Sequence, residues 1–153
     1  MFSLIITIVA IALVVALVAA TMYHGGDTLT QGRTTADAAA FVTGAQQISG
    51  AEVMHLSLTG VDATTVSGGA AGTDLVIDKY LASAPVVKGS AWTIDTVNKL
   101  VTATVDTDAV CIAINKSAGM ATATADANTV AAADFASLPY GCVSTGRTFQ
   151  FKF

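Results

Sequence analysis

The feature that most constrains this chain is its beginning, because the first 26 residues contain no Lys, Arg, Asp or Glu. Met1 to Tyr23 reads MFSLIITIVAIALVVALVAATMY. As a helix rising about 1.5 Å per residue, this stretch spans about 35 Å, enough to cross a hydrocarbon core about 30 Å thick. We expect an apolar helix that lies in a bilayer or is buried in an assembly.

A cleaved secretory signal is the competing interpretation of this run. Such a signal needs a basic n-region and a shorter apolar stretch, whereas the first basic residue here is Arg33. We therefore expect the helix to be retained. A newly made membrane helix normally carries Lys or Arg on its cytoplasmic side, so we also expect the chain to be a mature product whose basic leader was removed.

Small and β-branched residues alternate along the apolar run. Small residues let helices approach closely, and β-branched residues form stiff ridges. This mixture favours a helix that packs on copies of itself, although many ordinary anchors look similar. The small residues are Ala10, Ala12, Ala16, Ala19 and Ala20.

Two glycines, Gly25 and Gly26, follow the apolar run directly. Each weakens a helix by about 1 kcal/mol relative to Ala. Asp27 or Thr28 could then cap a new helix. We predict a hinge at Gly25-Gly26, with further soft points at Gly32 and Gly44.

From about Thr28 to Leu58 the pattern predicts an amphipathic helix whose second half lies against a globular body. The chain is thus expected to divide into an apolar helix over 1–26, an amphipathic continuation over 27–60 and a globular head over 61–153. The apolar positions recur at steps of three or four: Ala38, Phe41, Ala45, Ile48, Ala51, Met54 and Leu58. The polar residues expected on other faces are Gln31, Arg33, Asp37, Gln46, Gln47 and Glu52.

The rest of the chain predicts a small antiparallel sheet, and the chain as a whole an α+β fold. Strands are expected over Ala91–Asp95, Lys99–Asp106, Ala109–Asn115 and Thr148–Phe153, and the first three are joined by short hairpin connections, 96–98 and 107–108. The remaining segments are a loop over Val61–Gly72, a short helix or strand over Asp74–Ala84, a short helix near Asn128–Ala136, and a turn at Pro139–Gly141.

The two cysteines, Cys111 and Cys142, suggest one disulfide in an oxidising compartment. The bridge would close a loop of about 30 residues and contribute about 3–4 kcal/mol. Two free buried thiols and a metal pair are the alternatives, and a metal site needs more soft ligands than the sequence places near them.

Nothing in the sequence predicts catalysis or a cofactor. The net charge is −4, without a basic run for nucleic acid. Gly68-Gly69 lacks the lysine of a phosphate loop, and no G-x-S-x-G motif occurs. His24 and His55 each stand alone, so no metal is expected. Asn115-Lys116-Ser117 matches a glycosylation triplet, which is common by chance. Asp74, Asp78, Asp106 and Asp108 are interpreted as turn and surface residues.

Taken together, these features resemble a type IV pilin, in particular the type IVb subgroup. The local features that carry the resemblance are the start MFSLIITI, the segment VCIAINKSAG around Cys111, and the ending LPYGCVSTGRTFQFKF around Cys142. The resemblance covers the whole chain. It implies cleavage by a prepilin peptidase, N-methylation of Met1, and a helix that loses structure near Gly25 and Gly26 in the filament. The residues it implies for filament-core packing are Phe2, Ile5, Ile8, Ala12, Val15 and Ala19.

One departure from the family is Ile5, because pilins usually carry glutamate at the fifth mature position. In the family that carboxylate is thought to pair with the terminal amine of a neighbouring subunit. A buried carboxylate is expensive unless it is paired, so Ile5 removes both the cost and the partner. Ser3 and Thr7 are the nearby polar side chains, and both can bond to their own helix.

The expected function is therefore that of a structural subunit of an extracellular pilus on a bacterial surface, serving attachment, aggregation, cell-to-cell transfer or motility. The expected partners are copies of itself in a helical polymer, the inner-membrane assembly machinery, and the lipid bilayer before assembly. A pseudopilin or minor pilin of a secretion machine and a single-pass membrane-anchored binding domain are the alternatives. No enzymatic activity, cofactor or specific nucleic acid is expected.

Overall fold

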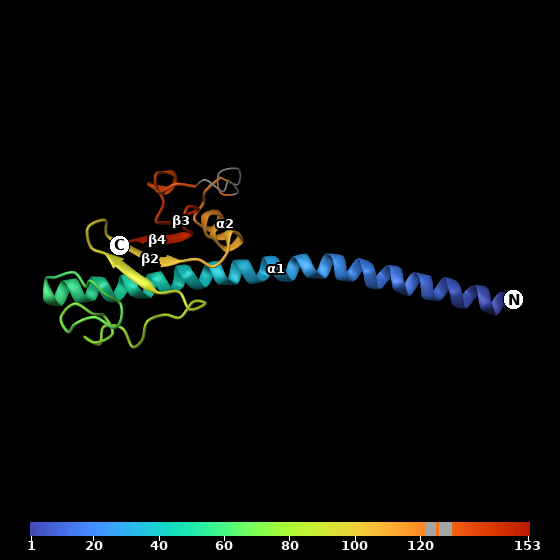
Figure 1. Ribbon diagram of the computed structural model, residues 1–153, viewed down its shortest axis with the longest axis horizontal. Coiled ribbons are helices and arrows are strands. Elements are labelled where there is room, and N and C mark those ends of the chain that lie inside the picture. The colour runs from blue at the N-terminus through green and yellow to red at the C-terminus, as the bar shows by residue number, and fades with distance from the viewer. Residues whose placement is uncertain (122–124, 126–129) are drawn as a thin grey trace. The chain divides into compact units, whose positions relative to one another are not determined.

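We describe the chain from a computed structural model, which covers residues 1–121, 125 and 130–153. The chain divides into two compact units, Met1–Arg33 and Thr34–Phe153. The expected α+β class is confirmed, with a long N-terminal helix packed on a small antiparallel sheet (Figure 1). In chain order the elements are α1 (Phe2–Thr59), β1 (Trp92–Asp95), β2 (Leu100–Thr104), α2 (Asp108–Ser117), the 3-10 helix η1 (Ala132–Phe135), β3 (Tyr140–Val143) and β4 (Thr148–Lys152).

The sheet has four antiparallel strands in the order β1-β2-β4-β3. Three predicted strands are confirmed as β1, β2 and β4, and β1 and β2 form the expected hairpin. The alternation along these strands turns Trp92, Ile94, Val101, Ala103 and Phe149 into the core. One face of the sheet is therefore apolar and needs a cover.

The later part of α1, within Thr34–Phe153, provides that cover. Phe41 is buried, and its ring centroid lies 6.0 Å from that of Trp92 and 5.8 Å from that of Phe149. Gly44 faces Trp92 so closely that a Cβ there would lie 2.9 Å from the indole. The expected soft point at Gly44 is thus wrong, because this glycine makes room for a tryptophan.

The buried stripe of α1 differs from the expected one at its C-terminal end. Met54 and Leu58 are 49% and 71% exposed, whereas Glu52 and His55 are fully buried. The helical period carries the stripe from Ile48 to these two polar residues, because a step of four reaches Glu52 and a further step of three reaches His55. The expected position of Glu52 on another face of the helix is therefore wrong.

The strand predicted over Ala109–Asn115 is wrong, because this segment belongs to helix α2. Thr107 caps the helix by accepting a hydrogen bond from the Val110 N–H, and Asp108 places a carboxylate in the first turn. The segment AVCIAIN alternates like a strand, yet its buried residues sit at helical spacing. The turn expected at 107–108 is therefore a helix start.

Three smaller expectations also change. Tyr140 and Gly141, expected in a turn, begin strand β3. Asp74–Ala84 forms neither a helix nor a strand but a series of turns. Of the short helix expected near 128–136, positions 128 and 129 lie outside the described residues, and η1 occupies Ala132–Phe135.

Both edges of the sheet are partly covered. At the β3 edge, the side chain of Asn115 on α2 donates to the Cys142 carbonyl at 2.9 Å and accepts from the Cys142 N–H at 2.7 Å. At the β1 edge, Thr65 forms an antiparallel bridge with Thr93. The expected disulfide is present between Cys111 and Cys142 and ties α2 to β3 rather than joining two strands.

Candidate assembly surface

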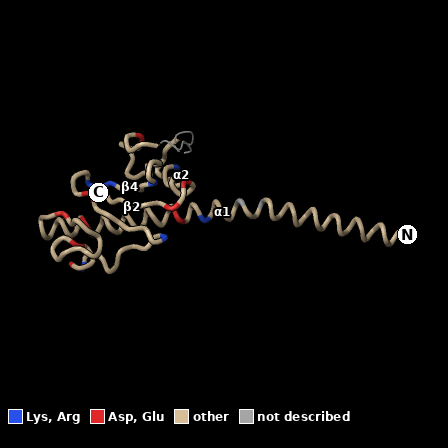
Figure 2. The backbone as a smooth tube through the Cα atoms, in the orientation of Figure 1, with Lys and Arg blue, Asp and Glu red and all other residues tan. Residues whose placement is uncertain are grey.

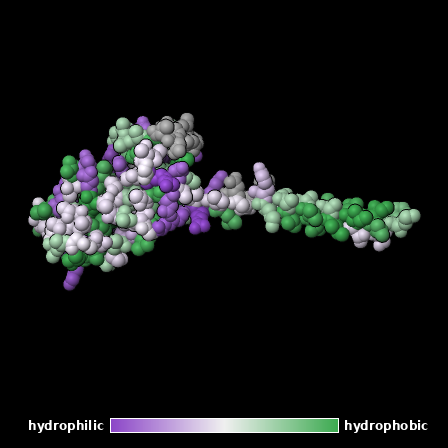
Figure 3. All heavy atoms as spheres, viewed as in Figure 1, coloured by the Kyte–Doolittle hydropathy of each residue, from purple (hydrophilic) through white to green (hydrophobic). Residues whose placement is uncertain are grey.

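The apolar segment at the start of α1 presents hydrophobic side chains to its surroundings. An 18-residue window in α1 has a mean hydropathy of 3.0, and none of it is buried. In the described part of the chain, α1 is the one helix long and apolar enough to cross a membrane. Figure 2 shows this segment without charged residues, and Figure 3 shows its hydrophobic surface. Such a surface needs lipid or protein around it.

The six residues implied for filament-core packing all lie on α1. Their steps of three or four place them along one face of the helix. All are exposed in the single chain, so this face is available to a neighbour. The residues are Phe2, Ile5, Ile8, Ala12, Val15 and Ala19.

The polar groups near this face bond within their own helix. Thr7 Oγ1 donates to the Leu4 carbonyl at 2.9 Å and lies 3.2 Å from the Ser3 carbonyl. Met1 is exposed, and its carbonyl accepts from the Ile5 N–H at 3.3 Å. The Thr7 hydroxyl therefore needs no hydrogen bond from a neighbouring molecule.

Helix α1 continues without interruption through Gly25 and Gly26 in the single chain. No new helix begins at Asp27 or Thr28, and the hydroxyls of Thr28 and Thr30 instead bond back to the carbonyls of Gly25 and Gly26 at 3.1 and 2.9 Å. A Cβ added at either glycine would meet nothing within 4 Å. The break near these residues in a filament therefore stays a prediction.

The disulfide is buried within the globular unit. Cys111 and Cys142 are both buried, with Cα atoms 5.3 Å apart. Asn115 is also buried, and its amide makes both bonds to the Cys142 backbone. Its place in a glycosylation triplet is thus incidental in this fold, because a buried amide that is bonded to the Cys142 backbone is not accessible to a glycan. Its structural role was missed in the sequence, where nothing but the triplet drew attention to it.

Two buried polar residues on α1 hold the loop that follows it. Glu52 Oε1 accepts from the Ala63 N–H at 2.9 Å, and His55 Nε2 lies 3.6 Å from Asp78 Oδ2. Burial raises the pKa of Glu52 above 4.5, while the hydrogen bond from Ala63 and the nearby His55 oppose the rise. The Glu52–Ala63 hydrogen bond therefore ties the loop to the end of α1.

Asp74 organises the same loop from within. Its buried carboxylate accepts from the N–H groups of Gly69, Val76 and Ile77 and from the Thr65 hydroxyl, at 2.6–3.0 Å. Burial alone would raise the pKa of Asp74, but these hydrogen bonds outweigh it and lower the pKa below 3.8. The expected surface role of Asp74 is wrong, because the carboxylate is fully enclosed.

Among the described residues, no group of three or more His, Cys, Asp or Glu is placed to hold a metal ion. Comparisons with protein-family models, with curated proteins and with solved structures found no match.

Proposed function

We propose that the chain is the structural subunit of an extracellular type IV-like pilus on a bacterial surface. The observation that carries the proposal is the charge-free first part of α1, whose hydrophobic surface is exposed on every side. Each Å² of this surface contributes about 25 cal/mol when it leaves water. A filament core made of many copies of α1 would bury this surface.

The three glycines of the first unit favour an assembly over a lone anchor. Gly25, Gly26 and Gly32 each have room for a side chain, and each costs an isolated helix about 1 kcal/mol. A lone anchor gains nothing from this loss of helix stability. A helix that must unwind, or that neighbouring helices approach closely, does benefit from glycine at these positions.

The proposal also assigns partners and processing. The apolar segment of α1 resides in the inner-membrane bilayer before assembly, where its length matches the hydrocarbon core. The inner-membrane assembly machinery then transfers the subunit to the filament. Prepilin cleavage leaves Met1 as the new terminus, which is N-methylated. The pilus serves attachment, aggregation, cell-to-cell transfer or motility.

The decisive experiment is electron microscopy of filaments sheared from cells that produce the chain, with mass spectrometry of the same fraction. We expect thin filaments built from a subunit that begins at Met1 and is about 14 Da heavier, the mass of one methyl group. A chain that stays in the membrane fraction as a monomer would overturn the proposal. It would favour the single-pass anchored domain, and Ile5 would be the leading explanation.

A further inference from the structure

A buried histidine on α1 faces a carboxylate in the turns that follow the helix. His55 is fully buried, and its Nε2 lies 3.6 Å from Oδ2 of Asp78. The Tyr80 ring packs edge-on against the imidazole, with the ring centroids 5.0 Å apart. A distance of 3.6 Å is too long for a hydrogen bond. The strength of the contact therefore depends on whether the imidazole carries a charge.

The opposite ring nitrogen indicates which proton the imidazole carries. Nδ1 lies 3.4 Å from Thr59 Oγ1, and that hydroxyl lies closer to the carbonyls of His55 and Val61, at 2.8 and 3.1 Å. The hydroxyl therefore gives its single proton to a carbonyl and remains an acceptor for an N–H at Nδ1. A neutral ring protonated at Nδ1 turns the lone pair of Nε2 toward Asp78, without a hydrogen-bond partner among the described residues. A second proton, on Nε2, replaces this repulsion by attraction.

Asp78 connects this contact to the turn that it organises. Both of its carboxylate oxygens accept from the Gly72 N–H at 2.9 Å, and Oδ2 also accepts from the Asp74 N–H at 3.3 Å. The contact with His55 therefore joins the end of α1 to the turns of residues 72–80. Leu75 in these turns is fully buried, so apolar packing still holds the segment when the charge is lost.

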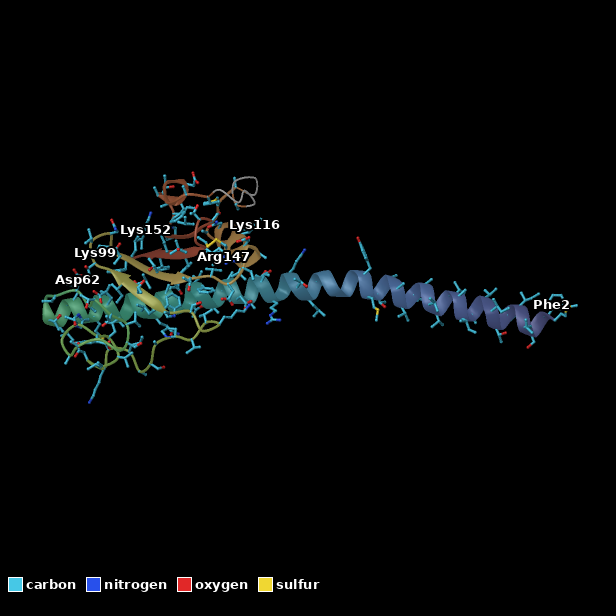
Figure 4. The ribbon with its side chains drawn as sticks, in the orientation of Figure 1. Phe2, Asp62, Lys99, Lys116, Arg147 and Lys152 are labelled. Atoms are coloured by element: carbon cyan, nitrogen blue, oxygen red, sulfur yellow. A yellow bond between two sulfur atoms is a disulfide. The ribbon has the colours of Figure 1, made fainter. Side chains whose placement is uncertain are left out.

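The other charged groups near the imidazole favour a positive ring. Glu52 lies three residues earlier on α1, and its buried Oε2 has no hydrogen-bond partner within the described part of the chain. The Asp74 carboxylate is bonded within its own loop. Asp62 and Lys99 pair with each other beside this end of α1, with Nζ 2.6 Å from both carboxylate oxygens (Figure 4). Lys79 is exposed to solvent.

We propose that His55 and Asp78 form a pH-sensitive clasp, in which the protonated imidazole holds the turns of residues 72–80 on α1 and the neutral imidazole loosens them. Histidine is the side chain that ordinarily changes its charge between about pH 5 and 8. Stability that the charged ring contributes is present on the acidic side of this range and is lost as the pH rises. The inference does not depend on the proposed function, because all of its groups lie in the globular unit.

Amide hydrogen exchange of the full chain in detergent, corrected for the intrinsic rate at each pH, tests the clasp. The reporters are the N–H groups of Gly72 and Leu81, which are bonded within the turns. We expect their protection to fall about tenfold between pH 5 and pH 8. Asp78→Asn keeps an oxygen for the Gly72 N–H but removes the charge, so its protection should change little over the same range.

The matched control is Glu52→Gln, because burial raises the pKa of Glu52 above 4.5 and its carboxyl can lose a proton in the same range. The fall in protection should persist in Glu52→Gln and disappear in Asp78→Asn. The opposite result, or constant protection in the wild-type chain, would overturn the clasp.

Nitrogen-15 NMR of the histidine ring gives a second readout that needs no variant to fold. Both nitrogens of His55 should carry protons at pH 5, and Nδ1 alone should carry one at pH 8. A ring that keeps one protonation state throughout this range would overturn the proposal.

Discussion

At the scale of single residues, buried polar side chains determine how the globular unit is held together. Asn115 bonds the backbone of Cys142, Glu52 bonds Ala63, and Asp74 bonds its own loop. Each of these side chains pairs with backbone groups, so its loss leaves those groups without a partner. The predictions at this scale concern stability.

Replacing Asn115 by Ala should lower the free energy of unfolding of the globular unit by about 2–4 kcal/mol, because the N–H and C=O of Cys142 lose their partner in a buried site. Urea denaturation of the full chain in detergent measures this. Gln47→Ala, at an exposed position of α1, is the control and should cost about 0.5 kcal/mol or less. Equal costs at the two positions would contradict the role of Asn115.

The fall in the free energy of unfolding at acidic pH should depend on Asp74. Its folded pKa lies below 3.8, so its contribution is present above that pH and is lost as the pH falls through the folded value. Asp74→Asn should therefore flatten the loss of stability as the pH falls below about 3.8. The measurement is a series of urea titrations from low to neutral pH.

Glu52 should show the opposite slope. Its folded pKa lies above 4.5, so its contribution is present below that pH and is lost as the pH rises through the folded value. Glu52→Gln should remove this loss above pH 4.5 in the same titrations. A wild-type and variant pair with parallel pH profiles would show that burial of this carboxyl has no energetic effect.

At the scale of elements, α1 contains glycines with two different roles. Gly44 makes room for Trp92, whereas Gly50 has nothing within 4 Å of an added Cβ. Gly44→Ala should destabilise the globular unit by about 1–3 kcal/mol through overpacking. Gly50→Ala should stabilise it by about 0.5–1 kcal/mol. Thermal unfolding of the two variants should therefore shift in opposite directions.

Gly25 and Gly26 should behave like Gly50 in the single chain but not in the filament. Gly25→Ala/Gly26→Ala should slow amide hydrogen exchange in this part of α1, since each change favours the helix by about 1 kcal/mol. If the helix breaks here in the filament, the same change should reduce the yield of sheared filaments. Gly50→Ala, which also strengthens α1, should leave that yield unchanged.

The sequence predicted most of the elements but not all of them. The strands β1, β2 and β4 carry a clear alternation, and the hairpin between β1 and β2 follows from its short connection. The apolar residues around Cys111 fit both the two-residue period of a strand and the 3.6-residue period of a helix. The segment is helical because Thr107 caps it. Glu52 and His55 are buried because the later loop supplies their partners, which a local pattern cannot reveal.

The candidate surface and the clasp show the same division. The apolar segment of α1 could be predicted from its sequence, because a charge-free run is a local property. The pairing of His55 with Asp78 could not, because the two lie far apart in the sequence and each was interpreted without a partner.

At the scale of the whole molecule, the filament and the single anchor make different demands on the same apolar segment. An anchor needs hydrophobicity alone, whereas a packed core also needs small residues where helices meet. Ala12 and Ala19 are exposed small residues on the face implied for packing. A substitution that keeps the hydropathy and adds bulk can therefore separate the two functions.

Ala12→Leu should leave the amount of chain in the membrane fraction unchanged, because Leu inserts at least as well as Ala. The yield of sheared filaments should fall, because the added bulk keeps neighbouring helices apart. Immunoblots of the membrane and sheared fractions measure both quantities. Ala12→Ser, which keeps the side chain small at the same position, is the control and should leave the filament yield unchanged. Equal filament yields for wild type and Ala12→Leu would argue against close packing at this face.

The covered edges of the sheet have a consequence for how the chain avoids amyloid. A cross-β stack grows when backbone groups at an open strand edge recruit an identical strand from another molecule. Here Asn115 occupies the backbone of Cys142 at one edge, and Thr65 bridges Thr93 at the other, beside a strand of four residues. These two contacts therefore reduce the number of open backbone groups through which the sheet could recruit a strand from another molecule.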